Sequence, residues 1–130
     1  MKEATLYGRL KQLAADLKGQ YMRVTDRFAE GVPDCYLCID GKSLWVEVKY
    51  ARAWPLRAGT RVQVGIQRAQ VIWLRQHRSA GGAAYLLVGV GREVFVFADA
   101  FELIELGIPQ AEFRALAAQQ DVGVLVSLLK

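Results

Sequence analysis

Apolar residues recur with a helical period near the start of the chain. From Glu3 to Leu17 they fall three or four positions apart, which gives one apolar stripe along an otherwise polar segment. The stripe consists of Leu6, Leu10, Leu13, Ala14 and Leu17. Lys18-Gly19 then supplies a basic last turn and a glycine stop. We therefore expect an amphipathic helix over this segment.

The pattern then changes to that of strands. Tyr21–Phe28 holds β-forming residues in loose alternation. Cys35–Ile39 and Leu44–Lys49 follow, and they flank Asp40-Gly41, a dipeptide that strongly favours a two-residue hairpin turn. These segments predict a first strand followed by an antiparallel hairpin.

A second helix and a second pair of strands come next. Gln67–Arg78 returns to the helical period and is followed by the stop Gly81-Gly82. The apolar positions of this helix are Val71, Ile72 and Leu74. Ala84–Val90 and Glu93–Phe97 have the composition of strands and are joined across Gly91-Arg92.

The last third of the chain predicts helical additions. Asp99 is a suitable N-cap for a short helix that reaches Leu106. Pro109 can open another helix, which we expect to run to about Gln120. Val122–Leu129 is apolar and fits either a last strand or an interface segment.

The order of these elements, α-β-β-β-α-β-β with helical additions, predicts one mixed α/β domain over residues 1–130. The chain is 53% hydrophobic and 23% charged, which is typical of a globular protein and too apolar for disorder. No apolar run approaches the ~20 residues of a membrane span. The first residues lack the apolar core of a signal peptide. We expect a soluble, intracellular protein.

Basic residues favour a polyanionic partner. The net charge is +4 and the isoelectric point is near 9.3, and Lys and Arg neutralise phosphates. Part of this charge falls in Tyr50–Gly65, which has no clean period and which we interpret as a basic loop. Its arginines and the one just after it fit contacts to the phosphates of a nucleic acid, and equally fit a solvated surface. They are Arg52, Arg57, Arg61 and Arg68.

The two cysteines form a C-x-x-C motif, which in other proteins marks a redox pair or half a zinc site. Here Cys35 and Cys38 fall within one predicted strand, and no second cysteine pair exists. Three residues along a strand separate two side chains by about 10 Å on opposite faces, too far for a disulfide. We predict buried, reduced structural thiols.

Side-chain alternation sorts Leu44–Lys49 between two faces. Its apolar residues share one face, and Glu47 and Lys49 share the other. The apolar face fixes the register, because a slip by one residue would bury both charges. Asp34 lies at the start of the partner strand. The hairpin should therefore bring Asp34 alongside Glu47 and Lys49.

This set of residues suits phosphodiester hydrolysis, which needs a hard cation at the phosphate and an activated water. Mg²⁺ prefers oxygen ligands, and Asp34, Glu47 and the carbonyl of Val48 would supply them. Lys49 would orient the water or help to deprotonate it, and would offset charge on phosphorus. Taken singly, an aspartate after a proline is often a turn residue and Glu-x-Lys is often a solvated face. Together with the hairpin between them, the residues favour a catalytic site.

Two segments resemble the PD-(D/E)xK nuclease core, and most closely its VRR-NUC branch. They are Gly31-Val32-Pro33-Asp34 and Val46-Glu47-Val48-Lys49. That branch follows its E-x-K strand with a helix that bears a glutamine, an aromatic residue a turn later, and then a glycine. Gln70, Trp73 and Gly81-Gly82 match this order.

The resemblance implies a restriction-endonuclease-like core and an endonuclease that acts on DNA in the cytoplasm of a bacterial or phage-infected cell. It implies Mg²⁺ or Mn²⁺ as the cofactor and no organic cofactor. A glutamate early in the first helix often joins the metal site of this family, and Glu3 fits, although Glu3 also suits the helix dipole alone. Gln67 is the rival of Gln70, whose spacing to Trp73 fits better. The catalytic set is Asp34, Glu47, Lys49 and Gln70, and the metal set is Glu3, Asp34, Glu47 and Val48.

Three functions are compatible with these residues. The first, which the resemblance implies, is a homodimeric nuclease of branched DNA, such as flaps or four-way junctions; the apolar tail and Val94–Phe97 are candidate segments for its interface. The second is a catalytically idle nucleic-acid-binding module, and the third is a nuclease subunit active only within a larger complex. Trp54 better fits a hydrophobic anchor for its loop than a base-stacking residue, and His77 better fits a surface residue or cap than a catalyst.

Overall fold

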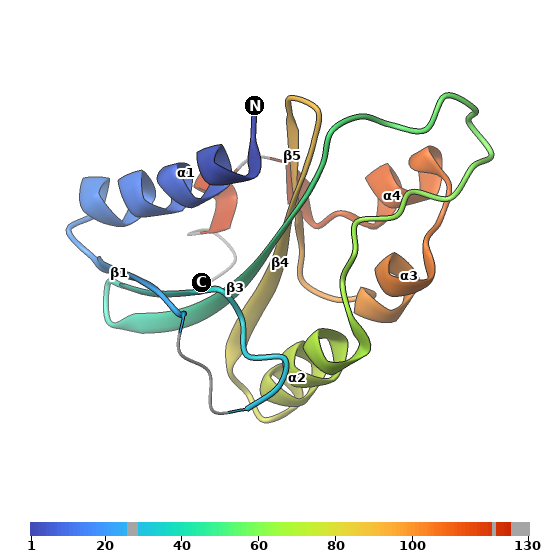
Figure 1. The fold of residues 1–130 in the computed structure, drawn as a ribbon. Coiled ribbons are helices and arrows are strands. Elements are labelled where there is room, and N and C mark those ends of the chain that lie inside the picture. The colour runs from blue at the N-terminus through green and yellow to red at the C-terminus, as the bar shows by residue number, and fades with distance from the viewer. Residues whose placement is uncertain (26–28, 121, 126–130) are drawn as a thin grey trace.

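The computed structural model describes residues 1–25, 29–120 and 122–125. Its helices are α1 (Glu3–Asp16), α2 (Arg68–Ser79), α3 (Phe101–Leu106), α4 (Gln110–Leu116) and the short 3₁₀ helix η1 (Val122–Leu125). Its strands are β1 (Gln20–Arg23), β2 (Cys35–Ile39), β3 (Lys42–Ala51), β4 (Ala83–Val90), β5 (Glu93–Phe97) and β6 (Gln119–Gln120). Figure 1 shows how these elements are arranged.

One mixed sheet of six strands organises the molecule, in the order β1-β2-β3-β4-β5-β6. Strands β3 and β4 are parallel, and the other neighbouring pairs are antiparallel. The parallel pair requires a crossover, which α2 provides between them. This arrangement confirms the predicted mixed α/β fold.

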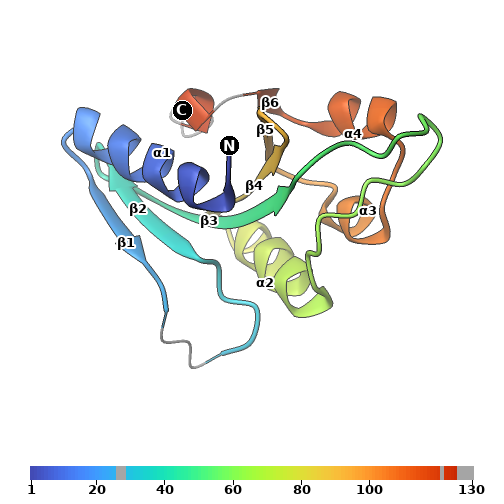
Figure 2. The ribbon, with the colours of Figure 1, turned by 45° about the horizontal axis from the view of Figure 1, so that its top comes forward.

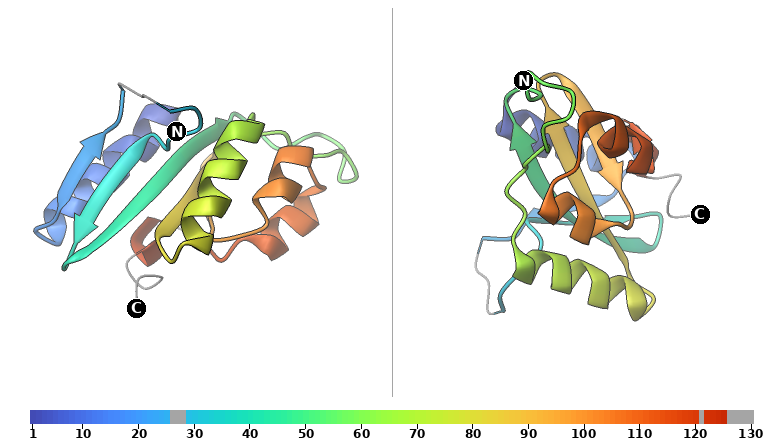
Figure 3. Two further views of the ribbon diagram at one scale, coloured as in Figure 1. Left: turned by 90° about the horizontal axis from the view of Figure 1, so that it is seen from below. Right: turned by 90° about the vertical axis from the view of Figure 1, so that its right-hand side faces the viewer.

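Helices cover both faces of the sheet, so the strands have apolar residues on both sides (Figure 2). The first core lies under α1 and η1 and includes Leu6, Leu10 and Leu125. The second core lies on the opposite face, against α2, α3 and α4, and includes Leu74 and Phe113. Figure 3 shows α2 and α3 lying over that second face. The central strands are therefore buried on both sides.

The predicted hairpin is present, and its turn explains the Asp-Gly pair. Asp40 and Gly41 have φ values of 54° and 76°, as the mirror-image turn that suits a twisted hairpin requires. β2 has the predicted bounds, and β3 is longer than predicted at both ends. β1 is shorter than the predicted Tyr21–Phe28, since it ends at Arg23; positions 26–28 lie outside the described residues.

The basic loop is fixed to the second core, which its sequence did not indicate. Val62, Val64 and Ile66 are buried at alternate positions, and Val62 forms a bridge with Ile108. Trp54 packs edge-on against two phenylalanine rings and donates a hydrogen bond to Glu93 (3.0 Å). Trp54 is therefore the anchor that we expected.

The C-terminal predictions need correction. Ala100 rather than Asp99 is the N-cap of α3, with φ of 58° and no side-chain cap. The helix after Pro109 ends at Leu116 instead of Gln120, because the chain then pairs with β5 as strand β6. Of the apolar tail, Val122–Leu125 forms η1 and packs into the first core, while residues 126–130 lie outside the described residues.

The prediction that the β5 run supplies a dimer surface is also wrong. Val94, Phe95, Val96 and Phe97 are all buried in the chain's own cores, so this run offers no exposed face to a partner. The apolar character of β5 comes from its position inside a sheet that is covered on both sides.

Both cysteines are free thiols, as predicted. Cys35 is buried, and burial raises the pKa of its thiol to about 11. Cys38 is only half-buried, which differs from the prediction, because it lies on the other face of β2 near the hairpin turn. Across the described ranges, no helix is both long and apolar enough to span a bilayer.

We predict that Phe113→Ala strongly destabilises the fold. Phe113 is fully buried among Phe95, Phe97 and Trp54, with ring centroids 4.9–5.5 Å away. Truncation of such a ring costs about 3–5 kcal/mol of the free energy of unfolding, which urea denaturation measures. The control is Leu56→Ala, because Leu56 is 105% exposed. A loss no larger than that of the control would contradict the prediction.

Candidate active site

A polar cavity of about 370 Å³ opens where α1, β1, β3 and α2 meet. Its walls bring together residues that are far apart in the sequence. The lining residues are Glu3, Tyr7, Arg23, Asp34, Glu47, Val48, Lys49, Tyr50, Val64, Gly65 and Gln70. All side chains of the predicted catalytic set line this one cavity, together with Glu3 and Val48.

Strand β3 supplies the acidic and basic pair. Glu47 and Lys49 lie on the same face of the strand, with Lys49 Nζ 3.6 Å from Glu47 Oε2. Glu47 is only 1% exposed, which corrects our expectation that the correct register leaves both charges unburied. The reason is that α2 and its neighbours cover this face as well. A buried carboxylate is costly unless charges or hydrogen bonds compensate it.

Asp34 is positioned by the antiparallel hairpin. Cys35 pairs with Val46, so Asp34 lies opposite Glu47 one step beyond the end of β2. The Val48 N–H donates a hydrogen bond to Asp34 Oδ2 (3.4 Å). Asp34 is 8% exposed, so both carboxylates lie at the buried end of the cavity.

Tyr7 and Arg23 were missed by the sequence analysis. The Tyr7 hydroxyl lies 3.0 Å from Asp34 Oδ2 and 3.2 Å from Glu3 Oε1. Burial, and then the charge of Asp34, raise the pKa of Tyr7, so its hydroxyl remains a donor at neutral pH. The Arg23 guanidinium lies 3.4 Å from the centre of the Tyr7 ring. The available signal was that Tyr7 follows Glu3 by one helical turn, which places both on one face of α1.

The start of α2 places Gln70, and not Gln67, on the cavity. Gln70 Oε1 accepts a hydrogen bond from the Gln67 N–H (2.9 Å), so the side chain also caps the helix. This contact fixes the direction of the Gln70 amide. Of the two glutamines that the sequence left open, Gln70 lines this cavity and Gln67 does not.

The loop that leads to Asp34 packs against α2 at Gly31. The φ of Gly31 is +82°, and a Cβ at this position would lie 2.1 Å from the backbone oxygen of Ala69 in α2. Only glycine allows this close approach. The loop that carries Asp34 is thereby held directly against the helix that carries Gln70.

The four arginines predicted to bind DNA do not line the cavity. They are Arg52, Arg57, Arg61 and Arg68. All are exposed, and the middle of the loop that carries the first three lies beside α4 at the edge of the molecule (Figure 1). Arg68 pairs with Glu105 (3.0 Å). His77 stacks on Trp73 with ring centroids 4.8 Å apart, so it supports packing on α2, away from the cavity.

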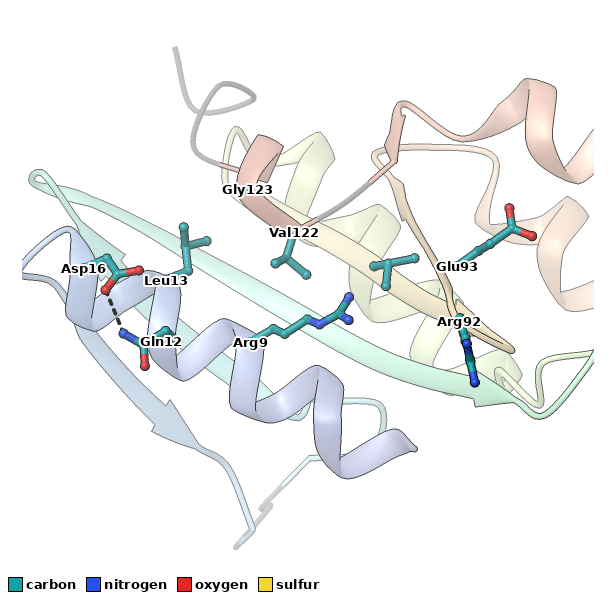
Figure 4. Close-up of a pocket in the computed structure, with 9 residues that line it drawn as sticks. Arg9, Gln12, Leu13, Asp16, Arg92, Glu93, Val122 and Gly123 are labelled. Carbon is teal, nitrogen blue, oxygen red and sulfur yellow. Dashed lines mark hydrogen bonds between the residues drawn. The ribbon is translucent and has the colours of Figure 1, made fainter. Parts of the chain in front are cut away.

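A larger cavity, of about 620 Å³, lies between α1, β5 and η1 (Figure 4). Its carboxylates are already engaged with neighbouring side chains. Asp16 accepts a hydrogen bond from Gln12 (2.7 Å), and Glu93 turns away toward Arg114, which lowers the pKa of the Glu93 carboxyl. This cavity holds no close carboxylate pair with a lysine, so it is a weaker candidate for catalysis.

The donor set of the smaller cavity fits a hard divalent cation. Asp34 and Glu47 offer carboxylate oxygens at its buried end, and Mg²⁺ is commonly bound by one or two carboxylates with waters and substrate oxygens. Within the described part of the chain, no three His, Cys, Asp or Glu side chains gather closely enough to hold one ion. Glu3 lines the cavity and meets Asp34 through the Tyr7 hydroxyl.

Comparisons with known proteins bear on the fold. No family model matches the sequence, and no curated protein matches it. Among solved structures, the chain is similar to a VRR_NUC domain, with a TM-score of 0.52 and 19% identity over 69% of this chain and 86% of that one. It also matches Hjc, a Holliday junction resolvase from Archaeoglobus fulgidus, with a TM-score of 0.49 and 20% identity over 84% of this chain and 98% of that one.

The chain therefore has a restriction-endonuclease-like fold, with a mixed sheet between helices. Within that class, the chain has the fold of a VRR-NUC domain, as the sequence predicted.

Proposed function

We propose that this protein is a metal-dependent endonuclease that hydrolyses phosphodiester bonds in DNA. The observation that carries the proposal is the convergence of Asp34, Glu47, Lys49 and Gln70 on one cavity of a nuclease fold. Two buried carboxylates beside a lysine suit phosphodiester chemistry, which is catalysed largely by positioning and charge stabilisation.

The metal ligands in this proposal are Asp34, Glu47 and the Val48 carbonyl. The N–H of Val48 points to Asp34, and the N–H and C=O of one strand residue point to the same side of the strand. Bound Mg²⁺ or Mn²⁺ would supply Lewis-acid stabilisation of charge on the scissile phosphate. Glu3 stays a predicted further ligand that would have to shift toward the ion, because the Tyr7 hydroxyl lies between its carboxylate and that of Asp34.

Lys49 and Gln70 act on the water and the phosphate in this proposal. Lys49 is held beside Glu47, at the position from which its ammonium group can orient an attacking water and offset charge on phosphorus. The amide of Gln70 faces the same space from the start of α2 and can donate a hydrogen bond to a phosphate oxygen or to the water.

The substrate that we propose is branched DNA, such as a flap or a four-way junction. The proposal rests on the resemblance of the Gly31–Asp34 and Val46–Lys49 segments to VRR-NUC nucleases and on the shared fold. The exposed arginines of the 52–61 loop would bind phosphates away from the cleavage point and give affinity without base recognition.

We predict that Lys49→Ala strongly slows metal-dependent cutting. Loss of a group that handles the attacking water should lower the cleavage rate by roughly 10²–10⁴-fold. Labelled four-way junction, flap and linear duplex, each with Mg²⁺, Mn²⁺ or EDTA, measure both the effect and the preferred substrate. The control is Lys11→Ala, an exposed lysine of α1 that does not line the cavity. Salt-sensitive binding without cutting by the wild type would indicate an idle binding module, and activity restored by a partner would indicate a subunit.

The loop arginines give a second prediction. Arg57→Ala and Arg61→Ala should weaken DNA binding about equally for all sequences, and each should reduce the slope of log Kd against log salt by about one. Fluorescence anisotropy over a salt series measures this slope. Arg9→Ala, in the cavity between α1 and η1, is the matched control. Unchanged slopes would remove the loop from the DNA-binding surface.

A third prediction concerns the homodimer that we propose for a two-fold symmetric substrate. Sedimentation at concentrations where the enzyme is active should give twice the chain mass of 14.5 kDa. Its interface must exclude the buried β5 run. A mass of one chain under those conditions would refute the dimer.

A further inference from the structure

The Tyr7 hydroxyl joins two carboxylates of the cavity. It lies 3.0 Å from Asp34 Oδ2 and 3.2 Å from Glu3 Oε1. A phenol has one hydrogen, so it donates to one of these oxygens at a time. The Val48 N–H approaches the same Asp34 oxygen (3.4 Å). Tyr7 and Val48 thus meet the Asp34 carboxylate at one oxygen, and together they set its rotation.

The Tyr7 ring is itself held in place. The Arg23 guanidinium lies 3.4 Å from the ring centre and comes from the edge strand β1. β1 is tied to the Asp34 segment, since Arg23 pairs with Cys35 and the Val24 N–H donates to the Asp34 carbonyl (2.7 Å). The arginine against the Tyr7 ring therefore comes from a strand that is hydrogen-bonded to the Asp34 segment.

We propose that Tyr7 is a positioning residue, whose hydroxyl holds the Asp34 carboxylate in the orientation in which it binds the divalent cation together with Glu47. Arg23 holds the Tyr7 ring in this arrangement. The inference rests on the proposed metal-dependent function and adds a role for this chain's own α1 residue. Groups that orient a metal ligand in this way commonly raise metal affinity by about 10- to 100-fold.

Tyr7→Phe separates this role from packing. Phenylalanine keeps the ring and its contact with Arg23, and it removes only the oxygen that touches Asp34 and Glu3. The matched control is Tyr36→Phe. The Tyr36 hydroxyl is exposed and forms a hydrogen bond with Ser43 (2.7 Å) between β2 and β3. Both variants lose one tyrosine hydroxyl, but only one of them changes the cavity.

The experiment measures Mn²⁺ binding by calorimetry without DNA, together with the Mn²⁺ concentration that gives half-maximal cleavage. We expect Tyr7→Phe to weaken Mn²⁺ binding by about 10-fold or more and to shift the half-maximal concentration by a similar factor. At saturating Mn²⁺, the cleavage rate of Tyr7→Phe should change by a smaller factor than its Mn²⁺ affinity does. Tyr36→Phe should match the wild type in both measurements.

A double-mutant cycle tests whether Tyr7 acts through Asp34. In an Asp34→Asn background, Tyr7→Phe should cause no further loss of Mn²⁺ affinity, since residues that act through one another are not additive. An additive loss, or an unchanged affinity of Tyr7→Phe in the native background, overturns this proposal alone. A wild-type chain that binds no Mn²⁺ overturns the metal-dependent function as well.

Discussion

The position of β3 at the centre of the sheet is the constraint on which the rest of the structure depends. This strand, Lys42–Ala51, pairs antiparallel with β2 on one side and parallel with β4 on the other. Both of its faces are covered, so its register is fixed by two apolar cores as well as by hydrogen bonds on both edges. Every residue that β3 brings to the cavity is therefore placed by the packing of the whole domain.

This central position gives the candidate site its electrostatic character. Glu47 is on a strand that is buried on both sides, and its carboxylate is removed from bulk water close to Lys49 and Asp34. Two carboxylates with little solvent repel each other unless cations compensate them, and a bound divalent ion would do so. The burial of both carboxylates would strengthen binding of the cation that we propose, because that cation would offset their mutual repulsion.

The sequence allowed the hairpin, both long helices and the Asp34–Glu47–Lys49 cluster to be predicted because each depends on local rules. A turn dipeptide sets the hairpin, and side-chain alternation sets the faces of β3. Tyr7 and Arg23 were missed because only tertiary packing brings α1 and β1 over Asp34. The short strand β6 was missed for the same reason, since two residues acquire strand geometry only through their partner β5.

Gly31 has a consequence for how this protein tolerates sequence change. The backbone of its loop rests on the first turn of α2 with no room for even a methyl group, and the contact is with backbone rather than with a flexible side chain. Any other residue there must push the Asp34 loop and the Gln70 helix apart. Position 31 is therefore constrained as tightly as a position with a reactive group, although glycine has none. The constraint comes from backbone packing, which sets the distance between the Asp34 loop and α2.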